Sequence, residues 1–266
     1  MGKLSKTIEA LGAIIRNPWL LNVVLADDSL WWKKLERANG IKNPFPVVDL
    51  FSFLGDEEQV LEPWAFLDGS SMPTDIALLK ALAKRFNECS YFEIGTWRGE
   101  SVANVASVAK ECFTLNLSRE EIMARGFDPR YADLHAHFSK ELSNVKHLYG
   151  DTSTFNFSGL NKKFDLIFID GDHSYPFVKS DTEKVFEHLI HDKSIVVWHD
   201  YAHSPERIRP EVMMGILEGV PEKFHSNLYH ASNSMCAVFI REDFKIEDFQ
   251  SPVKPTNNFR LKIKKA

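Results

Sequence analysis

The sequence predicts an α/β fold, namely a doubly wound, mostly parallel sheet of seven strands with a helical extension before it. Two observations carry this prediction. From about residue 71 onward, short apolar runs alternate with segments in which apolar residues recur at helical spacing. The runs at 164–170 and 194–200 are almost continuously apolar, as expected for parallel strands covered by helices on both faces.

The helices are predicted from apolar residues that recur at helical spacing and from residue types that favour the first turn of a helix. Pro73, Thr74 and Asp75 supply start chemistry for a helix whose apolar stripe reaches residue 86. A second helix should open directly after Gly99. Ser118 and Glu121 form a capping box for the segment 119–125. Further helices are expected at 131–142, 179–190 and 209–220.

The strands are predicted from apolar runs that follow these helices. Five parallel strands are expected at 89–94, 112–117, 145–150, 164–170 and 194–200. The runs at 226–231 and 234–240 are separated by a short polar turn, so they should form a closing antiparallel pair.

Composition limits the class of protein. The 266 residues carry a net charge of −5, which excludes a general basic field for nucleic acid, although five basic residues and no acid lie in the last fifteen. Three widely spaced cysteines suit buried thiols in a reducing compartment, and no stretch is a clean transmembrane span, so we expect a cytoplasmic protein. The predicted organisation is a helical extension (1–70), a central domain (71–245) and a basic tail (246–266). The sequence is compatible with a homo-oligomer but does not predict the oligomeric state.

The stretch "YFEIGTWRGES" joins a strand to a helix through two glycines. A dinucleotide-binding turn would read G-x-G-x-x-G, whereas this turn has Trp97 where the second glycine would fall. Glu93 stands just before the turn, and a carboxylate there repels a phosphate but suits an ammonium group. The turn therefore favours a ligand with an amino-acid end.

The stretch resembles the first motif of class I S-adenosylmethionine-dependent methyltransferases, in the O-methyltransferase-like branch. The stretch "FIDGDHSYPFVKSD" resembles the D-G-x-H-x-Y pattern of a subfamily that includes sugar and natural-product O-methyltransferases and cephalosporin-hydroxylase-like proteins. Asn116 stands where the family usually has an acid for the ribose hydroxyls. The resemblance implies that the cofactor is held by Glu93, Gly95, Thr96, Trp97, Gly99, Ser101, Asn116, Asp151, Thr152 and Asp170.

Two further roles fall at the ends of the fourth and fifth strands. Asp170, His199 and Asp200 could converge there and hold Mg²⁺ or Mn²⁺, as metal-dependent relatives do with acidic ligands. The alternative is metal-free, with Asp170 facing the cofactor. His173 is the leading candidate for general base, and Asp170 is assigned a catalytic role beside it. A histidine that only anchors its loop is the competing interpretation.

We therefore expect an S-adenosylmethionine-dependent O-methyltransferase that acts on a hydroxylated small metabolite or sugar. The extension and the loop at 69–73 should cover the site. Two alternatives stay open. One is a nicotinamide-dependent oxidoreductase on a similar sheet, and the other is a cofactor-binding scaffold without turnover, which Asn116 in place of an acid keeps open.

Overall fold

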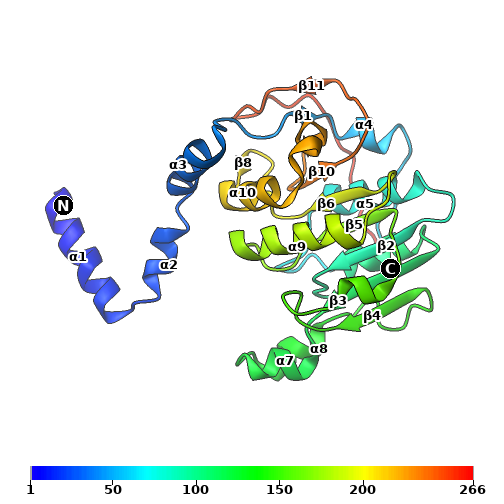
Figure 1. The fold of residues 1–266 in the computed structure, drawn as a ribbon, viewed down its shortest axis with the longest axis horizontal. Coiled ribbons are helices and arrows are strands. Elements are labelled where there is room, and N and C mark those ends of the chain that lie inside the picture. The colour runs from blue at the N-terminus through cyan, green and yellow to red at the C-terminus, as the bar shows by residue number, and fades with distance from the viewer. Residues whose placement is uncertain (1, 266) are drawn as a thin grey trace. The chain divides into compact units, whose positions relative to one another are not determined.

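The structure, a computed structural model, describes residues 2–265, and the chain divides into two compact units, residues 1–42 and 43–266. The first unit is helical, with α1 (Lys3–Arg16), α2 (Leu20–Leu25) and α3 (Asp28–Asn39) (Figure 1). The side chain of Asp27 accepts a hydrogen bond from the backbone of Ser29 at the start of α3. Gly40 ends that helix in the left-handed conformation.

The second unit is built on one sheet. Its strand order is β11-β1-β9-β10-β6-β5-β2-β3-β4. The parallel strands are β2 (Ser90–Ile94), β3 (Glu111–Asn116), β4 (Val145–Tyr149), β5 (Leu166–Ile169) and β6 (Ile195–Trp198). The antiparallel closing pair is β9 (Leu228–Ala231) and β10 (Ala237–Phe239). The predicted fold class and the closing pair are confirmed.

The strand count needs one correction, because the sheet has two short strands more than the seven predicted. β1 (Val47–Val48) pairs in parallel with β9, and β11 (Ile246–Glu247) pairs antiparallel with β1. Two-residue strands leave almost no periodic pattern in a sequence. As a result, residues 43–70, predicted as part of the extension, lie in the larger unit, and the predicted boundary near residue 70 falls instead after Lys42.

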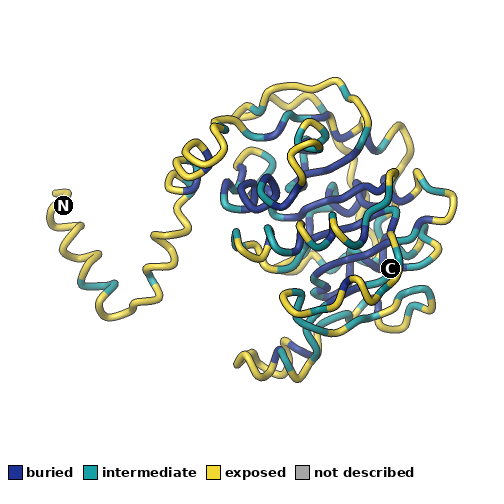
Figure 2. Tube along the Cα trace, viewed as in Figure 1, coloured by how far each residue is buried: buried dark blue, intermediate teal, exposed yellow. Residues whose placement is uncertain are grey.

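Helices cover both faces of the sheet. On one face, α5 (Pro73–Lys84) and α6 (Glu100–Ala106) pack with alternate strand residues into a buried apolar cluster. On the other face lie α9 (Tyr175–His188) and α10 (Pro210–Gly219). Phe186 of α9 stacks on Trp198 of β6, whose indole N–H donates to Thr182 at 2.9 Å. Figure 2 shows that the strands between these layers are the most deeply buried part of the chain.

The segment between β3 and β4 is less helical than predicted. α7 (Arg119–Ala124) has the expected capping box between Ser118 and Glu121. The helix expected at 131–142 appears only as α8 (Pro129–Leu134). Beyond it the backbone N–H of Ala136 donates to the carbonyl of Trp97, and that of Phe138 to the carbonyl of Arg98. These bonds to the glycine turn replace the bonds of a longer helix.

Shorter elements complete the chain. They are α4 (Phe51–Leu54), the 3₁₀ helices η1 (Phe157–Leu160) and η2 (Glu222–Asn227), and the hairpin of β7 (Ala202–Ser204) and β8 (Arg207–Ile208). Among residues 2–265, no helix is both long enough and apolar enough to span a bilayer.

Candidate functional site

A cavity of about 660 Å³ lies at the carboxyl ends of the parallel strands. Such an edge is the usual ligand position in an open α/β sheet. The predicted site residues that line the cavity come from all five strand ends, and they are Gly95, Thr96, Trp97, Asn116, Asp151, Thr152, Asp170, His173, His199 and Asp200. The predicted residues Glu93, Gly99 and Ser101 are not part of this lining.

The glycine turn after β2 is packed too closely for side chains. Gly95 has a φ of +85°, and a Cβ there would stand 2.1 Å from the backbone oxygen of Asp170. Gly99 has a φ of +80° and begins α6, and a Cβ there would lie 2.4 Å from Oγ of Ser139. The two glycines therefore let the turn touch the end of β5 on one side and the segment after α8 on the other.

Glu93 lies beneath the turn. Its side chain is fully buried and accepts hydrogen bonds from the hydroxyl of Tyr91 at 2.6 Å and from that of Thr96 at 3.1 Å. Burial raises the pKa of Glu93 to about 7, against the opposite effect of the hydrogen bonds from Tyr91, Ser101 and Thr96. The carboxyl group thus anchors the turn from inside and supports Thr96, which lines the cavity.

Asn116 ends β3 and points to the same wall of the cavity as the turn. Its side-chain amide lies 2.7 Å from Nδ1 of His135, and that ring nitrogen lies 3.0 Å from the carbonyl oxygen of Thr96. Burial lowers the pKa of His135, which favours the neutral ring. The amide nitrogen of Asn116 faces His135 and also donates to the carbonyl of Leu117 at 3.3 Å, and the amide oxygen accepts from the backbone N–H of Thr96 at 3.4 Å.

Asp151 and Thr152 follow β4. One carboxylate oxygen of Asp151 pairs with Arg125, and the other accepts from the backbone N–H of Ser153 at 2.8 Å. The hydrogen bonds from Ser153 and then the ion pair with Arg125 lower the pKa of Asp151. Lys184 donates to the carbonyl of Thr152 at 2.6 Å. Both predicted residues are therefore held rigidly at the cavity wall.

His199 is surrounded by three carboxylates. Its Nδ1 lies 3.1 Å from Asp170 and 3.2 Å from Asp200, and its Nε2 lies 3.1 Å from Asp75. Burial alone would lower the pKa of His199, but the three carboxylates raise it well above the ordinary value. With a proton on each nitrogen the ring has no lone pair for a metal. The raised pKa favours this doubly protonated ring, and His199 is not among the side chains whose ligand atoms converge within 4.8 Å of one another.

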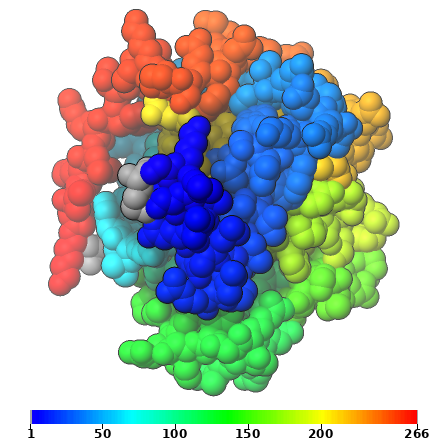
Figure 3. All heavy atoms as spheres, turned by 90° about the vertical axis from the view of Figure 1, so that its left-hand side faces the viewer, coloured from blue at the N-terminus to red at the C-terminus, as the bar shows by residue number. Residues whose placement is uncertain are grey.

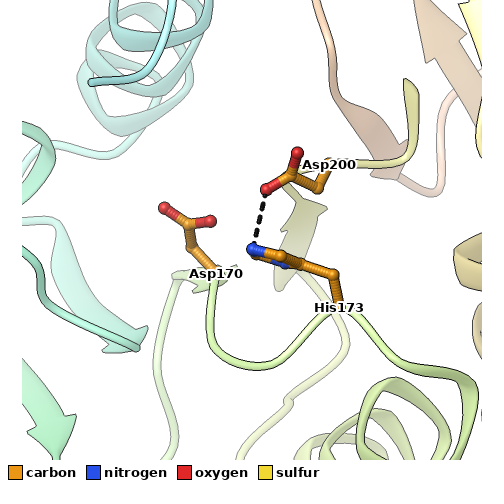
Figure 4. A group of neighbouring side chains, drawn as sticks. All are labelled: Asp170, His173 and Asp200. Carbon is orange, nitrogen blue, oxygen red and sulfur yellow. Dashed lines mark ion pairs between the residues drawn. The ribbon is translucent and has the colours of Figure 1, made fainter. Parts of the chain in front are cut away.

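His173 takes the place that was predicted for His199. Its Nε2 lies 3.1 Å from Asp200, and Figure 4 shows both side chains directed toward each other with Asp170 beside them. One ligand atom from each of Asp170, His173 and Asp200 lies within 4.8 Å of the others. The described residues thus offer two carboxylates and one imidazole at a single point of the cavity.

Asp200 is held in an unusual backbone conformation. Its φ is +53°, in the left-handed region that costs a non-glycine residue about 1 kcal/mol. Burial would raise the pKa of Asp200, but His199, His173 and Arg209 together lower it. Strain retained by a charged residue at a cavity is typical of a functional position.

Several lining residues were not predicted from the sequence. Trp97 stacks on Tyr131 with ring centroids 4.3 Å apart, and Tyr131 stacks on Phe127 at 5.0 Å, which gives the cavity an aromatic wall. The four-residue spacing of Phe127, Tyr131 and His135 was the available signal. Asp75, in the first turn of α5, was predicted only as a helix start.

The loop before α5 also lines the cavity, as predicted for the residues near Gly69. Asp68, Gly69 and Ser70 belong to the lining. Arg98 donates to the carbonyl of Asp68 and to Ser70 at 2.8 Å, and Glu100 accepts from the hydroxyl of Ser70 at 2.9 Å. The loop is therefore fixed to the glycine turn and to the start of α6.

Comparison with known proteins gives one match to a protein family. Residues 92–201 match the family model described as "Methyltransferase domain", which confirms the methyltransferase resemblance over this segment. The segment runs from β2 to the residue after Asp200, so it includes the ends of all five parallel strands and the loop that carries His173. A comparison with curated proteins found no match.

Among solved structures, the chain is similar to an O-methyltransferase from Bacillus cereus in complex with SAH, at 15% identity, covering 85% of this chain and 97% of that chain, with a TM-score of 0.48. It is also similar to an SAH-bound methyltransferase from Podospora anserina, at 17% identity, 66% and 81% coverage and a TM-score of 0.45. It is similar as well to a TDP-rhamnose 3′-O-methyltransferase of calicheamicin biosynthesis, at 15% identity, covering 64% of this chain and 80% of that chain, with a TM-score of 0.45. Values this low assign no activity to the chain.

Proposed function

We propose that this chain, whose residues 92–201 match the methyltransferase-domain family, is an S-adenosylmethionine-dependent O-methyltransferase that acts on a hydroxyl group of a small metabolite or sugar. The observation that supports the proposal best is that seven of the ten predicted cofactor residues, all of them inside the matched segment, line one cavity. The volume of about 660 Å³ is within the range of small-molecule sites.

The cavity walls suit the parts of the methyl donor. Asn116 and His135 offer polar atoms for the ribose hydroxyls, and Asp151 offers carboxylate oxygens for the exocyclic amine of adenine. The indole of Trp97 lies at the glycine turn, where an aromatic face attracts the positive sulfonium. Since the proposed donor carries no phosphate, the turn has no need of a third glycine.

The reaction in this proposal is an in-line displacement. The acceptor oxygen forms a bond to the methyl carbon while the bond from that carbon to the sulfonium breaks, and the hydroxyl proton leaves. Nε2 of His173 donates to the Asp200 carboxylate 3.1 Å away, so the ring accepts this proton at Nδ1, and Asp200 stabilises the imidazolium that results. Positioning of the two reactants supplies most of the acceleration.

A divalent ion is a second candidate for assistance, favoured by the convergence of Asp170, His173 and Asp200. The donor set fits Mg²⁺ or Mn²⁺, and such an ion would lower the pKa of an acceptor hydroxyl. We favour proton transfer to His173 because His199 and Arg209 already give Asp200 two positively charged neighbours. With these two cations beside it, the carboxylate of Asp200 is balanced without a metal ion.

The acceptor would lie between His173 and the loop at 68–70. This loop is tied to Arg98 and Glu100, so its residues present a fixed surface. A cavity with several carboxylates, an amide and an aromatic wall suits a polyhydroxylated acceptor better than an apolar one.

Calorimetric titration and labelled methyl transfer test the proposal. We expect micromolar or tighter binding of adenosylhomocysteine, no comparable binding of a nicotinamide dinucleotide, and transfer of label to a member of a panel of hydroxylated acceptors. Tight binding of the dinucleotide alone would favour the oxidoreductase alternative. Binding of adenosylhomocysteine without transfer to any acceptor would favour the scaffold.

A further inference from the structure

Helix α1 carries an apolar stripe that nothing in its own unit covers. Leu4, Ile8, Leu11 and Ile15 follow one another at spacings of four and three residues, so they lie on one face of the helix. Their exposed fractions run from 55% to 79%. None of the 14 residues of α1, all of which the structure describes, is buried.

The apolar surface continues into the next helix of the same unit. Trp19 is 64% exposed, and Val23 and Leu25 of α2 are 57% and 62% exposed. The side chains of α1 and α2 face the viewer in Figure 3 (dark blue). So many exposed aliphatic and aromatic side chains within one short segment indicate an interaction surface, because water is a poor solvent for them.

The charges on this segment indicate the kind of partner. Residues 2–25 contain the three basic side chains Lys3, Lys6 and Arg16 and one acid, Glu9, whereas the chain as a whole has a net charge of −5. Lys6 lies on the face of α1 opposite the stripe, and Lys3 and Arg16 flank that face. A basic polar face combined with aliphatic residues and tryptophan is the composition of a helix that lies in the surface of an anionic membrane.

A second copy of the chain fits less well. The 4-3-4 spacing is also that of a coiled-coil seam, but it lasts for only two heptads before Pro18, and stable coiled coils need three or four. The net positive charge of the segment would also repel the same segment of another copy.

We propose that α1 and α2 form a lipid-docking segment that binds the surface of anionic bilayers, with the stripe of α1 and Trp19 in the interface and the basic residues at the headgroups. This inference is independent of the chemistry proposed for the cavity.

Co-sedimentation of the full chain with phosphatidylcholine vesicles, with and without phosphatidylglycerol, tests the proposal. We expect binding only to the vesicles with phosphatidylglycerol, and weaker binding at high salt. The double variant Ile8→Glu, Ile15→Glu should lower the partition coefficient at least about tenfold. Replacing Lys3, Lys6 and Arg16 by Gln should cost about fivefold per residue.

The matched control is Val60→Glu, which makes the same kind of change at an aliphatic side chain that is 61% exposed in the larger unit. It should bind like the wild type. The basic residues at 254–265 also attract anionic vesicles, so equal binding by the wild type and by the double variant would overturn the proposal. An absence of vesicle binding by the wild type would also overturn it. The same holds if sedimentation velocity shows self-association of the wild type that the double variant abolishes, while the double variant still binds vesicles.

Discussion

Nε2 of His199 lies 3.1 Å from a carboxylate oxygen of Asp75, and both side chains are buried. The contact joins the end of β6 to the first turn of α5, which are 124 residues apart in the chain. Asp75 also accepts from the backbone N–H groups of Met72 and Met235. The carboxylate of Asp75 thus holds the imidazolium of His199, the start of α5 and the turn between β9 and β10 in place.

Replacing Asp75 by Asn should destabilise the protein by about 3 kcal/mol at pH 7. The amide can still accept from the backbone, but it leaves His199 with one carboxylate fewer in a buried position, and breaking a buried ion pair costs several kcal/mol. Urea unfolding measures the change. The control is Asp133→Asn, which removes the partner of Arg119 at the exposed surface and should leave the midpoint unchanged. Equal midpoints for all three proteins would show that the buried contact contributes nothing.

Replacing Gly95 by Ala should prevent stable folding, or lower the free energy of unfolding by more than about 3 kcal/mol, because the new Cβ would stand 2.1 Å from the backbone oxygen of Asp170. Gly126→Ala is the matched control. Gly126 has the same φ of +85°, but no atom lies within 4 Å of the position that its Cβ would take, so it should lose only about 1 kcal/mol. Thermal unfolding compares the two. Similar losses would mean that the turn can move away from β5.

The sequence was sufficient for the order of strands and helices because periodic apolar patterns are local. The capping box of α7 and the closing pair were predicted for the same reason. The early end of α8 was not, because it depends on carbonyl groups of Trp97 and Arg98 that are distant in the sequence. The edge strands β1 and β11 are too short to show a period.

At the site, the sequence indicated which residues lie at strand ends but could not assign their partners. His173 and His199 were both visible as candidates. Which of them is a buried cation depends on Asp75, a residue from another helix that looked like an ordinary helix start. The position of Glu93 was likewise not predictable, because a side chain next to the glycine turn can point either into the cavity or into the protein interior beneath the turn.

Glu93 should make the stability of the protein depend on pH. Burial raises the pKa of Glu93 to about 7 from 4.5, so between these values the native state keeps a proton that the unfolded state has released. The free energy of unfolding should therefore fall as the pH rises from 4.5 to 7, by about 2–3 kcal/mol from this group, and level off above 7. Glu93→Gln should flatten this part of the profile, measured by urea unfolding across the window.

The control for this profile is Glu58→Gln at an exposed position, which should keep the slope of the wild type. An unchanged slope in Glu93→Gln would mean that the buried carboxyl group is ionised throughout the window.

Asn116→Asp should strengthen the binding of adenosylhomocysteine about tenfold. A carboxylate would accept from a ribose hydroxyl with charge assistance, and it could accept from Nδ1–H of His135, which lies 2.7 Å from the present amide nitrogen. Calorimetric titration measures the change. Asn161→Asp, at an exposed position, is the control for added charge. Weaker binding by Asn116→Asp alone would place the ribose elsewhere in the cavity.

His173→Gln should lower kcat for methyl transfer by a factor of about 100 to 10,000, the usual contribution of a general base, with the affinity for adenosylhomocysteine unchanged. His188→Gln, near the end of α9, is the control and should keep the rate of the wild type. Because His199 and Arg209 already neutralise the carboxylates around His173, the wild-type rate should persist after chelation with EDTA. Loss of activity in EDTA with recovery in Mn²⁺ would mean that His173 binds a metal ion and does not accept the proton. An unchanged rate in His173→Gln would mean that His173 does neither.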